Sequence, residues 1–148
     1  MKFKIPAFIL LPLFVALFIF INASASSTPT PAQEIEWHSY DDGMARGKFE
    51  KKKVFLHFTA DWCYYCGIME KKTFKDPAII SSLNENFIAI KVDYDKEEKI
   101  SESYYVMGLP DTIFIAEDGQ IIGRRPGYIS PDQLKFIIKS ILEARSQK

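Results

Sequence analysis

The sequence predicts an α/β domain in which a central mixed β-sheet is flanked by helices on both faces. Residues 54–59 and 87–92 are short apolar runs rich in strand-forming residues, a pattern typical of strands buried on both faces. Segments with helical spacing alternate with these runs, as in chains that connect strands through helices. An Asp-Gly turn between residues 112–116 and 120–124 predicts a hairpin, which makes the sheet mixed.

Length and composition indicate one globular domain and exclude some functions. The chain has 148 residues, of which 47% are hydrophobic and 26% charged. Nineteen basic residues balance nineteen acidic ones, so no basic excess indicates a nucleic-acid partner. Two cysteines and two histidines leave little material for a closed zinc site of four such ligands, and we expect no metal.

Residues 1–25 are predicted to be a signal peptide that precedes the fold. Lys2 and Lys4 come before an uncharged run over residues 5–21, and the sequence Ala-Ser-Ala allows cleavage after Ala25. The uncharged run is slightly shorter than the roughly 20 residues that span a bilayer, so a retained membrane anchor is the alternative. Either way the rest of the chain is predicted to be secreted or, in a bacterium, periplasmic, where disulfide chemistry is possible.

A short polar linker is predicted between this segment and the domain. Residues 26–33 are small, polar and proline-containing, and the domain covers residues 34–148. Loss of the two lysines with the signal peptide would leave a net charge of −2.

The domain is predicted to open with a helix over residues 40–51. Ser39 stands where its side chain can cap this helix. Gly43 and Gly47 lower the helix propensity of the segment. The buried strand over residues 54–59 follows.

Two further helices are expected before the second buried strand. One begins after Cys63 and continues to about Lys72. The other is capped by Asp76, has Pro77 in its first turn and ends near Asn84.

An exposed helix over residues 96–105 is predicted before the hairpin.

The last helix of the chain has the clearest sequence pattern. The final helix has Ser130 as its cap, Pro131 in its first turn and Gln133 to complete a capping box. Its predicted apolar face consists of Leu134, Ile137, Ile138, Ile141 and Leu142.

Two cysteines at the start of a helix point to redox chemistry. Cys63 and Cys66 follow a buried strand and flank Tyr64 and Tyr65. The unsatisfied amides of a helix's first turn stabilise a thiolate, so Cys63 is the candidate nucleophile. Cys66, one turn further, is the candidate resolving thiol that releases a mixed disulfide.

Three other roles are open to this pair. A structural disulfide would close so short a ring that it would remove little chain entropy. The two cysteines and His57 could bind copper, although His57 lies within an apolar strand. The thiols could also be inert.

The sequence resembles the thioredoxin superfamily over residues 35–142. The segment 58–66, with Trp62 directly before Cys63, resembles the junction between strand and active site in that family. Gly108-Leu109-Pro110 resembles the family's loop with a cis-proline, and Gly127-Tyr128 followed by Ser130 resembles the turn into its final helix. The resemblance implies a thioredoxin fold in which Leu109 and Pro110 bind the substrate backbone; an ordinary turn proline is the alternative.

Within the superfamily the sequence is similar to two groups of exported reductases. Residues 60–63, Glu70 and the pairs at 73–74 and 76–77 resemble the periplasmic C-terminal domain of the membrane thiol–disulfide reductase. Residues 108–112 look more like reductases of cytochrome c maturation. The resemblance implies protein disulfides as substrates and a separate membrane protein as electron donor.

The resemblance also suggests supporting residues. His57 stands where thioredoxins carry a buried aspartate, and it could relay a proton for Cys66 near its own pKa or be a core histidine. Glu70 could tune the thiol pKa values or be a solvated carboxylate. Lys91 matches a lysine that thioredoxins place beside this aspartate; because the aspartate is missing here, we favour an ordinary lysine without that pairing.

The direction of electron flow is left open by Tyr64 and Tyr65, which occupy the dipeptide that tunes redox poise in this superfamily. A monomeric reductase is the preferred function. A thiol oxidase or isomerase, and a copper-binding chaperone, are the alternatives. The sequence contains no nucleotide or flavin fingerprint, so the redox-active disulfide is the only cofactor expected.

Overall fold

The computed structural model describes residues 34–144, and the predicted signal peptide or anchor and the linker lie outside the described residues. No helix within residues 34–144 is both long and apolar enough to cross a membrane. The elements along the chain are β1 (Trp37–His38), α2 (Tyr40–Glu50), β2 (Lys53–Thr59), α3 (Tyr64–Lys71), the 3₁₀-helix η1 (Thr73–Lys75), α4 (Pro77–Asn86), β3 (Phe87–Asp93), α5 (Glu98–Ser103), β4 (Asp111–Ile115), β5 (Ile121–Pro126) and α6 (Pro131–Glu143).

The five strands form one mixed sheet in the order β1-β3-β2-β4-β5. The central strand β2 pairs in parallel with β3 and antiparallel with β4, and β4 continues into the hairpin with β5. Residues 53–58 of β2 are all buried, as the apolar run predicts. In this register His57 lies between Lys91 on β3 and Thr112 on β4.

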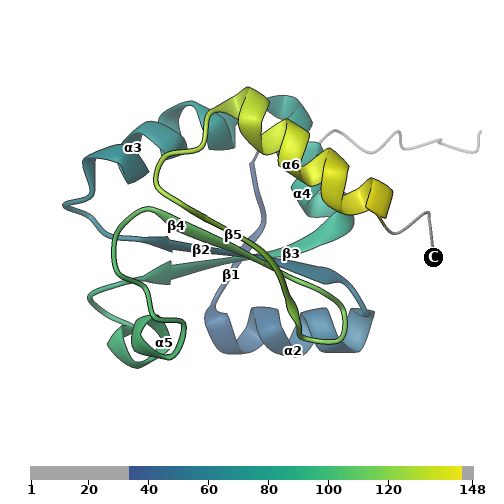
Figure 1. The fold of residues 1–148 in the computed structure, drawn as a ribbon, viewed down its shortest axis with the longest axis horizontal. Coiled ribbons are helices and arrows are strands. Elements are labelled where there is room, and N and C mark those ends of the chain that lie inside the picture. The colour runs from purple at the N-terminus through teal and green to yellow at the C-terminus, as the bar shows by residue number, and fades with distance from the viewer. Residues whose placement is uncertain (1–33, 145–148) are drawn as a thin grey trace, which may run out of the picture. The chain divides into compact units, whose positions relative to one another are not determined.

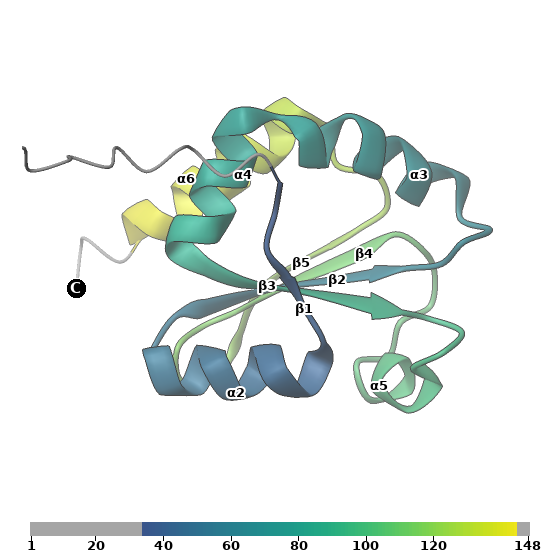
Figure 2. The ribbon, with the colours of Figure 1, turned by 180° about the vertical axis from the view of Figure 1, so that it is seen from behind.

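Helices cover both faces of the sheet, which confirms the predicted α/β architecture. Figures 1 and 2 show α3, α4 and α6 on one face and α2 and α5 on the other. Alternate side chains of β2 serve the two layers: Phe55 packs with residues of α4 and α6, whereas Leu56 and Phe58 pack toward α2 and α5. His57 therefore faces the same layer as α3.

Helix α2 lies close to the sheet through its two glycines. A Cβ atom on Gly43 would collide with the side chain of Ile90, and one on Gly47 would lie 2.8 Å from Val54 Cγ2. The residues that lower the helix propensity are thus required for the packing of α2. Ser39 occupies the N-cap position, but its side chain makes no capping hydrogen bond, so the predicted capping role is wrong.

Helices α4 and α6 begin as predicted. The carboxylate of Asp76 accepts hydrogen bonds from the backbone N–H groups of Ala78 and Ile79, at 2.9 and 3.3 Å. Ser130 and Gln133 form the complete capping box at the start of α6. These side chains satisfy amide groups that would otherwise lack partners at the helix ends.

Helix α5 is shorter than the predicted segment of residues 96–105. The carboxylate of Asp93 accepts hydrogen bonds from the backbone N–H groups of Asp95 and Lys96, which forms a turn before the helix. Tyr105, two residues after the last residue of α5, adopts a left-handed conformation with φ of 51°, so the helix does not continue to this position.

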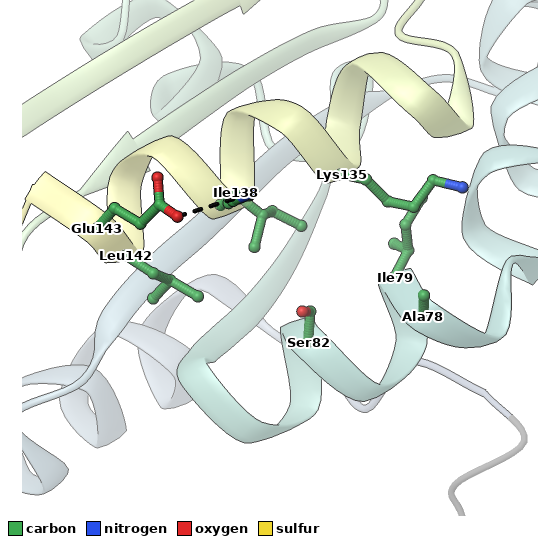
Figure 3. Close-up of a pocket in the computed structure, with 8 residues that line it drawn as sticks. Ala78, Ile79, Ser82, Lys135, Ile138, Leu142 and Glu143 are labelled. Carbon is green, nitrogen blue, oxygen red and sulfur yellow. Dashed lines mark ion pairs between the residues drawn. The ribbon is translucent and has the colours of Figure 1, made fainter.

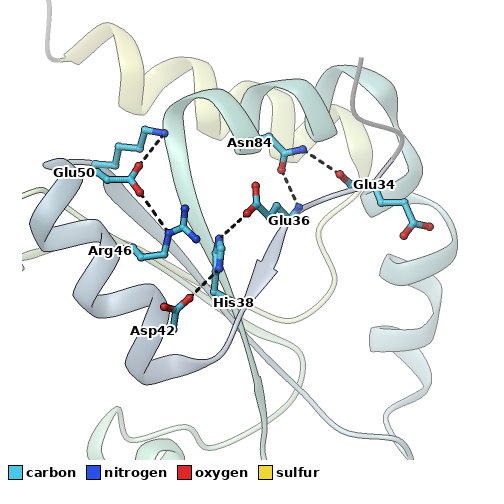
Figure 4. A network of polar contacts seen from close by, with 8 residues as sticks. Glu34, Glu36, His38, Asp42, Arg46, Glu50 and Asn84 are labelled. Atoms are coloured by element: carbon cyan, nitrogen blue, oxygen red, sulfur yellow. Dashed lines mark hydrogen bonds and ion pairs between the residues drawn. The ribbon is translucent and has the colours of Figure 1, made fainter. Parts of the chain in front are cut away.

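The edge strand β1 was not predicted, because two residues are too few to show a strand periodicity. Side chains fix it in place (Figure 4). Asn84 of α4 accepts a hydrogen bond from the Glu36 N–H at 2.9 Å and donates one to the Glu34 carbonyl at 3.0 Å. His38 lies 3.2 Å from the carboxylate of Asp42 on α2.

Candidate active site

Cys63 and Cys66 form a disulfide where β2 leads into α3. Cys63 is the N-cap residue of α3, and Cys66 lies in the first turn of the helix. Cys63 is 7% exposed and Cys66 is 1% exposed. The difference in exposure suits Cys63 for attack on a partner and Cys66 for release of that partner, the roles proposed from the sequence.

The backbone around Cys63 can stabilise a thiolate. Its Sγ accepts a hydrogen bond from the Cys66 N–H at 3.2 Å, in the place of a capping side-chain oxygen. Hydrogen bonding and the positive end of the helix both favour the negatively charged form of sulfur. This arrangement lowers the energy of a Cys63 thiolate relative to the thiol.

Exposed aromatic side chains surround the disulfide. Trp62, Tyr64 and Tyr65 are 66%, 75% and 55% exposed, although each has a large apolar ring. The indole N–H of Trp62 donates to the carboxylate of Asp95 at 2.7 Å. The ring of Tyr128 lies 6.3 Å from that of Tyr65 and extends the surface, although the sequence indicates Tyr128 only as part of the turn into the last helix.

The loop before β4 lies against the same disulfide. Leu109 packs on the cluster of Ala60, Cys63 and Cys66, and the Leu109–Pro110 peptide bond is cis. Within residues 34–144 the backbone N–H and C=O of Leu109 have no hydrogen-bond partner, whereas the Pro110 carbonyl accepts from the Gly127 N–H at 2.7 Å. Leu109 thus offers a donor and an acceptor beside Cys63 to an extended peptide.

An arginine on the neighbouring strand fixes this loop. No local sequence motif indicates this role of the arginine. Arg124 of β5 pairs with the buried carboxylate of Asp111, with Nε 3.0 Å from Oδ2. Its terminal nitrogens donate to the carbonyls of Tyr104 and Tyr105 at 2.9 and 3.0 Å. Both charged residues lie in ordinary strand positions, so only the register of the hairpin reveals the pair.

His57 is fully buried, in the layer that contains α3. Its Nδ1 lies 3.0 Å from Thr112 Oγ1, and its Nε2 has no partner among the described residues. Burial, and then the positive charge of Lys91, lowers the pKa of His57 to about 3. With this lowered pKa the ring is neutral in the physiological range, which favours the core-histidine alternative over the proton relay.

Glu70 and Lys91 form an ion pair across the same layer. Glu70 Oε1 on α3 lies 2.6 Å from Lys91 Nζ on β3. The Lys91 ammonium also lies 4.4 Å from the centre of the Trp37 ring. In place of the aspartate that β2 lacks, α3 supplies Glu70 as the partner of Lys91, a pairing that the sequence did not indicate.

The buried histidine makes stability depend on pH. Unfolded chains protonate histidine below about pH 6.5, whereas folded His57 stays neutral down to about pH 3, so the unfolded state binds more protons in this interval. The free energy of unfolding should therefore fall as the pH decreases from 6.5 to 4. We expect wild type to lose about 3 kcal/mol more than His57→Phe over this interval, measured by urea denaturation at each pH.

The other histidine provides the control for that measurement. His38→Gln should retain the wild-type loss of stability, because it leaves buried His57 and its contact with Thr112 unchanged. Parallel curves for wild type and His57→Phe would contradict the assignment of a depressed pKa to His57.

No group of three or more His, Cys, Asp and Glu side chains within residues 34–144 is placed to hold a metal ion. A groove between α4 and α6 is another hollow (Figure 3). It measures about 420 Å³ and is lined by Ala78, Ile79, Ser82, Lys135, Ile138, Lys139, Leu142 and Glu143. Neither cysteine nor histidine is among its lining residues.

A family model described as a thioredoxin-like domain matches residues 40–142 of the chain. The thioredoxin of Mycoplasmoides gallisepticum is 32% identical over 88 residues, which cover 60% of this chain and 83% of that protein. A solved thioredoxin from Thermus thermophilus superposes with a TM-score of 0.67 at 21% identity, covering 74% of this chain and 88% of that one. The last likeness confirms the predicted thioredoxin fold.

Two relatives have names that state a redox activity. The disulfide bond reductase DsbH of Chlamydia pneumoniae is 24% identical over 108 residues, covering 65% of either protein. The thiol:disulfide interchange protein DsbD of Campylobacter jejuni is 36% identical over 87 residues, covering 56% of this chain and 15% of that protein. The chain thus spans less than two thirds of the length of both.

Proposed function

Because the chain belongs to the family of thioredoxin-like domains, and is a thiol–disulfide oxidoreductase of this type, we propose that it reduces protein disulfides outside the cytoplasm. The observation that carries the proposal is the asymmetry of the two sulfurs. Cys63 is partly accessible at the start of α3, whereas Cys66 is covered. A dithiol built in this way attacks with one sulfur and resolves with the other.

The proposed cycle transfers two electrons to the client. The Cys63 thiolate attacks one sulfur of a client disulfide, and the other client sulfur leaves as a thiolate that takes up a proton. Cys66 then gives up its proton and attacks Cys63 Sγ, which releases the second client thiolate. The client gains two thiols, and the protein ends with the Cys63–Cys66 disulfide.

The client chain is proposed to lie along the loop of Leu109 and Pro110. The N–H and C=O of Leu109, which have no partner in the described part of the chain, can hydrogen-bond an extended segment, which places a client sulfur beside Cys63. Trp62, Tyr64 and Tyr65 form the rim on which the rest of the client rests.

Glu70 is proposed to support the second step. Its carboxylate lies one helical turn beyond Cys66 and is held by Lys91, so it adds a fixed charge near the resolving sulfur. Its proposed role is to tune the pKa of the Cys66 thiol.

Export and electron supply are part of the proposal. The segment 1–25 favours delivery across a membrane, where it is either cleaved or retained as a tether. Regeneration of the dithiol then needs an electron donor, and the proposed donor is a separate membrane protein, as the resemblance stated from the sequence implies.

The reduction potential of the Cys63–Cys66 couple tests the direction of the reaction. The full chain is equilibrated with a thiol buffer, and the free thiols are trapped and counted. A value near that of thioredoxin, about −270 mV, is expected for a reductant. A value near about −120 mV, typical of the strong periplasmic oxidant, would instead identify a thiol oxidase.

A further inference from the structure

Gly67 lies in the interior of α3, although nothing in the packing of the helix requires a glycine there. Glycine is a poor helix former, and the other helical glycines, Gly43 and Gly47, are needed for close approach to the sheet. A Cβ atom on Gly67 would meet no atom within 4 Å, and its φ is not in the left-handed region. The absence of a side chain at this position therefore leaves open space on the outer face of α3.

That space is a hollow beside the nucleophilic sulfur. It measures about 370 Å³, and Cys63 is one of its lining residues. Tyr64, Gly67, Ile68 and Lys71 follow one another at the spacing of a single helix face and form its wall along α3. Asp61 and Trp62 complete the lining.

The charges around the hollow leave one cation unpaired. Asp61, at one end, lies 3.9 Å from the ammonium of Lys96. Glu70, the acid nearest to Lys71 in sequence, is paired with Lys91. Lys71 itself has no ion-pair partner within the described part of the chain.

We propose that this hollow is a subsite that binds an acidic side chain of the client, close in sequence to the client's reacting cysteine. The aliphatic part of a glutamate would lie over Ile68 and the ring of Trp62, and its carboxylate would pair with Lys71. The subsite deepens the proposed reduction of protein disulfides, and it selects clients by charge on the side of Cys63 formed by α3.

Single-turnover reduction of matched peptides tests the subsite. The probes are short peptides, each with one cysteine held in a mixed disulfide with a small thiol. Glutamate or glutamine is placed one to three residues before or after that cysteine. The fully reduced chain should reduce the best glutamate peptide about threefold faster than its glutamine counterpart, the size of effect expected for an exposed ion pair. This preference should decrease in high salt.

Three variants locate the effect. Lys71→Gln should abolish the preference, whereas Lys72→Gln, which removes the neighbouring lysine that does not line the hollow, should retain it. Gly67→Ala should weaken the preference by filling the hollow while raising the melting temperature, because alanine is the better helix former. Stability and selectivity would then change in opposite directions, which a purely structural role of Gly67 does not explain.

The outcomes separate this subsite from the reductase activity. Equal rates for glutamate and glutamine peptides at every position, or a preference that survives Lys71→Gln, would contradict the subsite alone. A chain that reduces none of the peptides would overturn both the subsite and the proposed function.

Discussion

Replacing Cys63 with serine is expected to reduce the rate of disulfide reduction by on the order of a thousandfold or more, as for the loss of other enzymatic nucleophiles. A serine hydroxyl is un-ionised at neutral pH, so the hydrogen bond from the Cys66 N–H no longer stabilises a reactive anion. The measurement is the steady-state reduction of a small disulfide-bonded protein, with a thiol reagent as electron donor.

Cys66→Ser is the matched variant, and its behaviour should differ in kind. Cys63 remains free to attack, but nothing resolves the intermediate, so a mixed disulfide between Cys63 and the client should accumulate. Non-reducing electrophoresis and mass spectrometry would detect it. Accumulation of the adduct on Cys66 in the Cys63→Ser variant instead would reverse the assignment of the two sulfurs.

Arg124→Met is expected to lower the free energy of unfolding by about 3 kcal/mol, because it leaves the Asp111 carboxylate buried without its partner. Asp111 already has one oxygen, Oδ1, without a partner among the described residues. The loop should also lose its anchor, since the carbonyls of Tyr104 and Tyr105 lose their donors. Urea denaturation measures the first effect, and KM for a disulfide-bonded client should rise as a result of the second.

The adjacent arginine provides the control. Arg125→Met removes a charge from the same strand without disturbing the Asp111 pair, so stability and KM should change little. The double variant Arg124→Met with Asp111→Leu should recover part of the lost stability, because no unpaired charge is then buried. A loss below about 1 kcal/mol in Arg124→Met would show that the pair contributes no more than a surface ion pair.

Most of the fold could be predicted from local sequence patterns. The buried strands β2 and β3 are continuous apolar runs, and Asp76 and Ser130 are strong capping residues. Local sequence patterns did not predict the features that depend on contacts between distant segments. β1 is held by Asn84, almost fifty residues away, and the side chain of Ser39 does not cap α2 despite its suitable position.

In the candidate site, too, local features could be predicted from the sequence, whereas contacts between distant segments could not. The sequence places Cys63 and Cys66 at a helix start because both the motif and the strand before it are local. The partners of the charged residues depend on the register of the sheet, so the pairs Glu70–Lys91 and Arg124–Asp111 could not be predicted. The electrostatic effect of burial on His57 likewise requires knowledge of what covers it.

The two edges of the sheet have a consequence for how the domain behaves in a crowded environment. β1 offers only two residues for pairing, and β5 carries two arginines, ends in Pro126 and pairs with β4 through an irregular register. Short, charged and proline-terminated edges are poor templates for added strands. The edges of this sheet therefore protect the domain against edge-to-edge pairing with other chains.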